Sequence, residues 1–159
     1  MIEHRLEVTL EQPPERAFDF FVDFRNEPAW NPDCLTVEKT SAGPIGVGST
    51  FTGKMKRIGP SESEIVALDR PRHCSVVDRS RGAEGTFDFR FTPHDRGTRV
   101  EVTMRMQPRG PGLHAELGRV VGAEPLAQQL FPAVAVFGHR RIRVGFDERL
   151  ARFLDGATD

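Results

Sequence analysis

The chain begins with a strict alternation of apolar and polar positions. Residues 2–10 set Glu, Arg and Thr against an apolar-side series made of Ile2, His4, Leu6, Val8 and Leu10. A period of two is typical of a β-strand with one covered face. Pro13 and Pro14 end this strand, and Pro14 and Glu15 suit the first turn of a helix. The helix would place Ala17, Phe18, Phe21 and Val22 on one side, and a short second helix or turn would lead to Trp30.

Between Leu35 and Gln107 the chain contains six extended segments separated by turn signals. Each break holds Gly, Pro or Asp, the residues that supply turn geometry, as in IGPS, RGAEG and PHDRG. The segments are LTVEKT, STFTGKMKR, ESEIVALD, HCSVVDRS, TFDFRFT and TRVEVTMRMQ. We therefore predict consecutive antiparallel strands. A sheet that is apolar on one face only must be covered on that face.

The carboxyl-terminal segment is the expected cover. Two runs have helical spacing: Leu113, Leu117, Val120 and Val121, then Ile142, Phe146, Leu150 and Phe153. The basic stretch HRRIR at 139–143 is expected on the solvent side of this helix. Gly122–Pro125 and Pro132 interrupt the segment and predict breaks or a kink. The chain has no repeats or linkers, and its 159 residues suit a single domain over 1–159.

Composition and charge narrow the classes of function. The net charge of −1 disfavours a nucleic-acid partner, because binding phosphates needs a basic surplus. The charged amino terminus does not suit a signal peptide, and the uncharged stretch 125–138 is too short and too broken by proline to span a bilayer. Cys34 and Cys74 form no CxxC pair, so we expect a reducing, cytoplasmic compartment. The 12 Phe, with one Trp and no Tyr, permit a dry interior.

The order strand, two helices, six strands and terminal helix resembles the START-like, helix-grip superfamily, also called SRPBCC or Bet v 1-like. Within it, the chain resembles the polyketide cyclase/dehydrase branch. The resemblance covers nearly the whole chain and rests on LEVTLEQPPERAFDFFVDFRNEPAWNPDCLTVEKT (6–40), GVGSTF (46–51), LDRPRH (68–73) and FRFTPHDRGTRVEVTM (89–104). It implies an α+β fold, in which a seven-stranded curved antiparallel sheet wraps around a long C-terminal helix, with two short helices after the first strand. It also implies a deep apolar cavity between sheet and helix.

Eight apolar residues are candidates for the lining of this cavity. In proteins that look like this one, the tryptophan of EPAWNP, here Trp30, packs toward the sheet near the cavity; the alternative is a plain core anchor. The other candidates come from the strands and from the terminal helix, and an ordinary sheet-on-helix core is their alternative. They are Phe51, Met55, Phe87, Phe89, Met104, Met106 and, from the helix, Phe137.

Polar residues on covered faces are more informative, because their burial is unfavourable unless they are paired. His4 lies on the apolar side of the first strand, and Arg57 is in phase with Phe51 and Met55. Either could contact a polar group of a guest, and an arginine could polarise a carbonyl during ring closure. Alternatively, both lie near strand ends and reach solvent. For the strand at 73–80, the sequence leaves open which set of alternating side chains faces inward.

Two classes of function follow from the sequence and the resemblance. One is the binding of a hydrophobic small molecule, lipid- or polyketide-like, by a monomer or homodimer. The other is a polyketide cyclase or aromatase that promotes aldol ring closure and dehydration, with His4 and Arg57 as catalytic candidates. No nucleophile motif is present and the five histidines are dispersed, so we expect no metal and no cofactor. The lack of Tyr favours binding.

Overall fold

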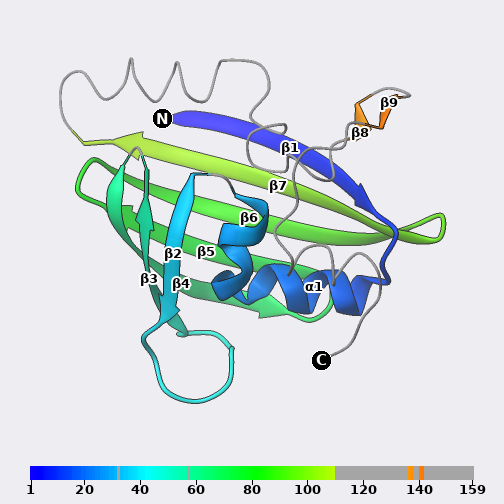
Figure 1. The fold of residues 1–159 in the computed structure, drawn as a ribbon, viewed down its shortest axis with the longest axis horizontal. Helices are drawn as coiled ribbons and strands as arrows, with labels where there is room; N and C mark the ends of the chain where they lie inside the picture. Colours follow the sequence, from blue (N-terminus) through cyan, green and yellow to red (C-terminus); the bar gives the residue numbers. More distant parts are fainter. Residues whose placement is uncertain (32, 57, 110–135, 138–139, 142–159) are drawn as a thin grey trace.

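The computed structural model describes residues 1–31, 33–56, 58–109, 136–137 and 140–141, and it describes their side chains except those of residues 2, 4, 6 and 136–141. Seven strands and three short helical segments account for most of residues 1–109 (Figure 1). The elements are β1 (Ile2–Leu10), α1 (Pro14–Val22), the 3-10 helix η1 (Phe24–Asn26), α2 (Glu27–Trp30), β2 (Cys34–Lys39), β3 (Thr50–Met55), β4 (Gly59–Asp69), β5 (His73–Ser80), β6 (Ala83–His94), β7 (Gly97–Pro108), β8 (Val136–Phe137) and β9 (Arg140–Arg141).

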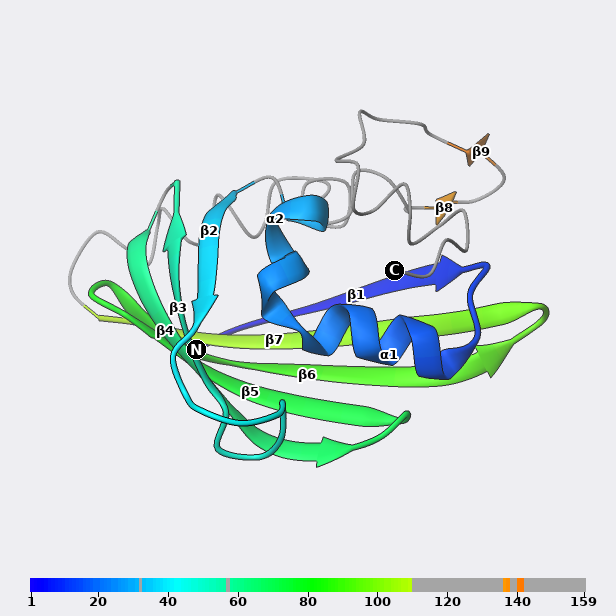
Figure 2. The same cartoon turned by 60° about the horizontal axis from the view of Figure 1, so that its bottom comes forward.

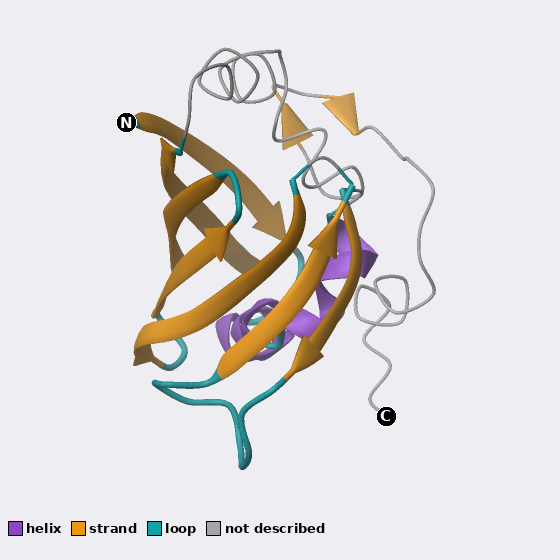
Figure 3. Ribbon diagram, turned by 90° about the vertical axis from the view of Figure 1, so that its left-hand side faces the viewer, coloured by secondary structure: helices purple, strands orange, loops and turns teal. Residues whose placement is uncertain are grey.

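The seven long strands form one antiparallel sheet in the order β1-β7-β6-β5-β4-β3-β2. The first strand pairs with the last along its whole length, from Ile2 opposite Met106 to Leu10 opposite Thr98. The sheet is strongly bent, and the helices lie on its inner, concave side (Figures 2 and 3). The prediction of a curved seven-stranded antiparallel sheet with short helices after the first strand is confirmed.

Strand β6 extends at both ends into motifs that the sequence predicted to be turns. The motifs RGAEG and PHDRG were expected to be turns, yet β6 runs from Ala83 to His94 and includes parts of both. The turn needs only a few residues, because Asp95 adopts a left-handed φ of 49°. Gly85 suits the strand, since a Cβ there would lie 2.9 Å from the carbonyl oxygen of Arg105.

Local chemistry explains the bend after α1. Pro14 occupies the first turn of this helix, where a missing N–H costs no hydrogen bond. The helix ends at Asp23, whose Oδ1 accepts a hydrogen bond of 3.2 Å from the backbone N–H of Arg25 and so begins η1. Asn26 Nδ2 then donates to the Phe20 carbonyl oxygen at 3.0 Å. These contacts turn the chain from α1 into α2.

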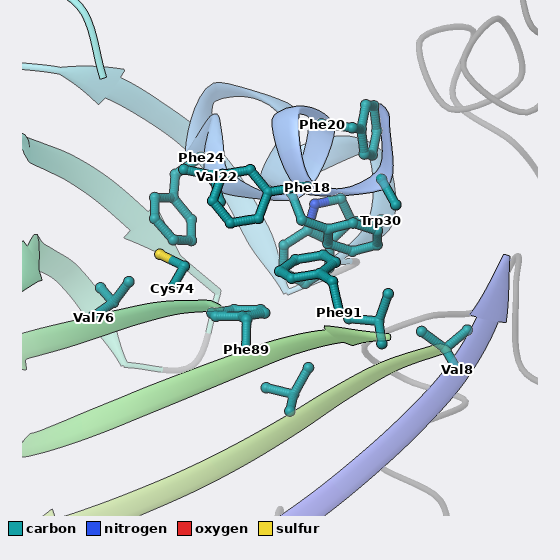
Figure 4. Packing of buried hydrophobic residues seen from close by; sticks show 14 of the residues in the cluster. Val8, Phe18, Phe20, Val22, Phe24, Trp30, Cys74, Val76, Phe89 and Phe91 are labelled. Atoms are coloured by element: carbon teal, nitrogen blue, oxygen red, sulfur yellow. The ribbon is translucent and has the colours of Figure 1, made fainter. Parts of the chain in front are cut away.

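Aromatic side chains join the helices to the concave side of the sheet (Figure 4). The ring of Phe91 lies 5.2 Å from that of Phe18 and 6.3 Å from that of Phe21, between centroids. The ring of Phe24 lies 5.2 Å from Phe51 and 6.2 Å from Phe89. Each such pair adds about 0.5–1.5 kcal/mol beyond the area that it buries. The helices are therefore anchored on the concave face by Phe89 and Phe91 of β6 and by Phe51 of β3.

The predicted long terminal helix falls mostly on residues 110–135 and 142–159, which lie outside the described residues. Within the described part, Val136–Phe137 and Arg140–Arg141 pair as the short antiparallel strands β8 and β9. The prediction that Phe137 and the basic stretch from 139 belong to a helix is therefore wrong at these four residues. Val and Phe favour extended structure, and Gly138 lowers helix propensity locally. That residues 1–159 form one domain stays a prediction.

Replacing Phe21 by Ala should lower the free energy of unfolding by about 3–5 kcal/mol, because Phe21 is 1% exposed and its ring packs on both Phe91 and Trp30. The control Leu35→Ala, at a residue 45% exposed, should change it by less than about 0.5 kcal/mol. Urea denaturation followed by circular dichroism measures both. Equal losses in the two variants would contradict the anchoring role of the helices.

Candidate ligand-binding face

Strand register decides which side chains share the concave face. One row of Cα partners crosses the sheet from β2 to β1, and alternate positions on each strand point to the same side. The row is Lys39, Phe51, Ser63, Asp78, Gly85, Met106 and Ile2. Phe51 packs on Phe24 of η1, which identifies the side of the row as concave.

The same register answers the question that the sequence left open for β5. Val76 pairs with Phe87, and Cys74 pairs with Phe89, whose ring packs on Phe24. Cys74 is 0% exposed and Val76 is 2% exposed. The inward set on β5 is therefore Cys74, Val76 and Asp78.

The apolar character of the concave face continues beyond the part that the helices cover. Phe87 and Met104 are Cα partners on β6 and β7, and Gly85 and Met106 form the next pair on this face. Phe87 is partly buried against the core, Met104 is 5% exposed and Met106 is half-buried. Apolar side chains thus extend toward the start of β6 and the end of β7.

Six of the predicted lining residues share the concave face. Four belong to the aromatic core or pack against it, and the fifth lies beside them on β7: Phe51, Phe87, Phe89 and Met104, then Met106. The sixth, Met55, alternates in phase with Phe51 and is half-buried at the end of β3, opposite Gly59. The described residues do not include Arg57, and they include only the backbone of Phe137 and of His4, which pairs with Met104.

Trp30 lies at the end of α2 and is 6% exposed. Its ring centroid is 5.4 Å from that of Phe21, on the neighbouring helix. This packing corresponds to the core-anchor alternative. A role of Trp30 in ligand binding stays a prediction.

Sequence reasoning missed a group of polar residues at one side of this face. Ser63 Oγ donates a hydrogen bond of 2.6 Å to Asp78 Oδ2, between neighbouring strands. Burial raises the pKa of Asp78, and the hydrogen bond from Ser63 opposes this effect. The alternation along the strand could have revealed Asp78, because this residue is in phase with the apolar Cys74 and Val76 and therefore points to the same side.

Glu27, in the first turn of α2, is the second carboxyl of this group. Asn31 Nδ2 donates to Glu27 Oε1 at 2.6 Å, and Asn31 itself is 7% exposed. The pKa of Glu27 is raised to about 7, mainly by burial. The hydrogen bond from Asn31 lowers this pKa, and the nearby charge of Asp78 contributes to raising it. Nothing in the sequence near Glu27 distinguishes it from an ordinary acidic residue at a helix start.

The two cysteines are buried free thiols. Burial, together with the charge of Glu27, raises the pKa of Cys34 to about 12. Burial, together with the charge of Asp88, raises the pKa of Cys74 to about 12 as well. Both thiols are therefore protonated at neutral pH, which disfavours nucleophilic catalysis by either cysteine.

A separate polar group lies on the convex side of the same strands. Asp88 Oδ1 is 2.7 Å from His73 Nε2, and Asp88 Oδ2 accepts a hydrogen bond of 3.2 Å from Ser75 Oγ. Asp88 alternates with Phe87 and Phe89, so its side chain points away from the concave face. The sheet thus separates this carboxyl from Glu27 and Asp78.

Among the residues that the structure describes, no helix is long and apolar enough to cross a membrane. No three of their His, Cys, Asp or Glu side chains gather in a way that could hold a metal ion.

The strand order, the bent sheet and the helices on its concave side are those of a helix-grip protein. The model of the family "Polyketide cyclase / dehydrase and lipid transport" matches residues 1–133, and the chain belongs to this family. No curated protein matches the sequence significantly.

Solved structures of low sequence identity share the fold. The protein TTHA0849 from Thermus thermophilus aligns with a TM-score of 0.63 and 18% identity, over 80% of this chain and 88% of its own. A START superfamily protein from Mycobacterium smegmatis aligns with a TM-score of 0.61 and 14% identity, over 80% and 96%. The di-domain ARO/CYC BexL, from the BE-7585A biosynthetic pathway, aligns with a TM-score of 0.60 and 16% identity, over 81% of this chain and 44% of BexL.

Replacing Glu27 by Gln should flatten the dependence of stability on pH. The pKa of Glu27 is raised from 4.5 to about 7, so the folded protein binds more protons than the unfolded chain between these values. The wild type should therefore lose up to about 3 kcal/mol of unfolding free energy as the pH rises through this window. Urea denaturation at pH 4, 5.5, 7 and 8 measures the loss.

The control for this series is Glu38→Gln, at an exposed carboxyl on β2. This variant should keep the slope of the wild type between pH 4.5 and pH 7, whereas Glu27→Gln should lose most of it. Parallel curves for the wild type and Glu27→Gln would rule out a raised pKa at Glu27.

Proposed function

We propose that this protein binds a hydrophobic small molecule, lipid- or polyketide-like, against the concave face of its sheet. The observation that carries the proposal is the run of apolar side chains Phe87, Met104 and Met106, which continues the core beyond the aromatic contacts of the helices and ends at the half-buried Met106. The family description, which includes lipid transport, supports the same class of ligand. The proposed guest lies over β6 and β7, beside the helices.

Apolar burial supplies the binding free energy in this proposal. Removal of apolar surface from water contributes about 25 cal/mol per Å², so roughly 300 Å² of guest surface yields about 7 kcal/mol before the entropy of association is subtracted. Met104 and Met106 are unbranched and polarizable, and such side chains adapt to guests of different shape. Moderate affinity for a range of apolar molecules is the expected behaviour.

A second candidate function is catalysis of the cyclase type. Glu27 and Asp78 place two carboxyl groups of raised pKa near an apolar surface, and a group that titrates near pH 7 can donate or accept the protons of an aldol closure. BexL, a protein of similar fold, is described as an ARO/CYC di-domain protein. The sequence-based candidates His4 and Arg57 stay predictions, and the lack of Tyr still favours binding.

Two further expectations belong to the proposal. The buried free thiols of Cys34 and Cys74 are compatible with a reducing, cytoplasmic compartment. A monomer or homodimer without a nucleic-acid partner is expected from the net charge of −1 and the proposed internal site.

Native mass spectrometry of the protein from its own host should detect a hydrophobic molecule that co-purifies with it. Replacement of Met106 by Glu should reduce the affinity for that molecule at least tenfold, because a charge would be placed on the proposed apolar surface. Since Met106 is half-buried, the fold should tolerate the change.

The control Val66→Glu changes a residue that is 43% exposed on β4 and should keep the wild-type affinity. A protein that carries no guest and binds none in titrations would refute the binding function. Equal affinity of the Met106 and Val66 variants would place the guest elsewhere.

Turnover separates the two candidate functions. A linear poly-β-keto thioester, incubated with the protein and analysed by mass spectrometry, should lose water upon ring closure faster than in buffer if the protein is a cyclase. Glu27→Gln, Asp78→Asn, His4→Ala and Arg57→Ala then identify the group that moves the proton, because the variant that lacks this group should lose about 10²-fold or more of the activity. Full activity of His4→Ala and Arg57→Ala would exclude these two residues, and no acceleration by the wild type would leave binding alone.

A further inference from the structure

Two polar pairs and one buried hydroxyl lie on the concave side of the fold: Glu27 with Asn31, Ser63 with Asp78, and Ser61 two residues before Ser63. Glu27 lies near enough to Asp78 for the charge of Asp78 to raise its pKa, and we call the five residues the acidic patch. They come from α2, β4 and β5 and the residue that follows α2. Register places Ser63 and Asp78 in the row that also contains Phe51 and Met106. The acidic patch therefore borders the apolar surface to which the proposed function assigns a guest.

Ser61 provides an independent sign of a missing polar partner. It is 3% exposed, and its Oγ has no hydrogen-bond partner in the part of the chain that the structure describes. Ser61 pairs with Gly53, and its Oγ lies 3.5 Å from the position that a Cβ of Gly53 would occupy. Gly53 and Phe51 share a side of β3, so this hydroxyl points to the concave face. Burial of a hydroxyl group without a hydrogen-bond partner is unfavourable.

Neither carboxyl group forms an ion pair with a described residue, although the charge of the neighbouring Arg79 lowers the pKa of Asp78 against the larger, raising effect of burial. No Lys, Arg or His of the described ranges forms an ion pair with Glu27 or Asp78. One oxygen of each accepts a hydrogen bond, from Asn31 and from Ser63, and the other oxygen receives none from a described residue. The acidic patch thus offers acceptors and negative charge together.

We propose that the acidic patch binds the protonated amino group of an otherwise apolar guest. An ammonium group donates three hydrogen bonds, which match the open oxygens of Glu27 and Asp78 and the hydroxyl of Ser61. Its positive charge also relieves the repulsion between the two carboxyl groups. A carboxylate head group would add to that repulsion, and an alcohol would supply one donor without charge. The proposal rests on the proposed function and specifies the class of guest, an apolar amine.

The test compares three probes with the same chain and different head groups: decylamine, decanol and decanoate. Isothermal titration of the full-length protein at pH 7.5 should give an affinity for decylamine at least tenfold higher than for decanol. Decanoate should bind most weakly. Because the apolar chain is constant, the ranking reports on the head group alone.

Variants locate the preference. Asp78→Asn and Glu27→Gln should each reduce the advantage of decylamine over decanol about tenfold and leave the affinity for decanol nearly unchanged. The matched control is Asp88→Asn on the convex side, where the carboxylate also accepts a hydrogen bond from a serine, Ser75. This control should keep the full advantage of decylamine.

The outcomes distinguish the two proposals. If all three probes bind with similar affinity, or if decanoate binds best, the amine site is refuted and the apolar site remains. If none of the probes binds to the wild type, the proposed function fails and the amine site fails with it. If the Asp88 variant loses the preference as strongly as the Asp78 variant, the acidic patch is not its source.

Discussion

Coverage of one apolar sheet face is the constraint on which the rest of this structure depends. On the concave side of the bent sheet, Phe18, Phe21 and Phe24 of the short helices meet Phe89 and Phe91 of β6 and Phe51 of β3. Aromatic packing fixes α1 and η1 there and leaves the rest of the face to other apolar surface. The site of the proposed guest is therefore a consequence of how short these helices are.

The position of the polar residues gives this arrangement its chemical character. Glu27 and Asp78 lie at the margin of an apolar surface, where burial disfavours their charged forms. The burial of a carboxyl group does not by itself stabilise the fold. Asn31 donates a hydrogen bond to Glu27, and Ser63 donates one to Asp78. Unfavourable groups that are nevertheless held in place are typical of sites that meet a ligand or a reacting group. Binding and catalysis would use the same face and differ in whether a proton moves.

Fold and function are separable in this family. TTHA0849, the Mycobacterium smegmatis protein and BexL share this fold although their sequences are only 14–18% identical to this chain, so the common feature is the shape of the sheet. In the proposed function, the specific chemistry comes from side chains on the concave face. Because their raised pKa values keep Cys34 and Cys74 protonated at neutral pH, the carboxyl groups are better candidates than the thiols for chemistry at this face.

Local patterns in the sequence predicted the seven strands, the helix α1 with Pro14 in its first turn, and the inward Phe and Met positions of β6 and β7. These features could be predicted because periodicity and turn residues act over a few positions of the chain. Local patterns did not reveal the ends of β6, where close approach of Gly85 to β7 extends the pairing, or the strand at Phe137. The acidic patch depends on register between β4 and β5 and on the path of the chain into α2. Only the tertiary structure brings Glu27, Ser63 and Asp78 together, since pairing between distant segments is set by the packing of the whole sheet.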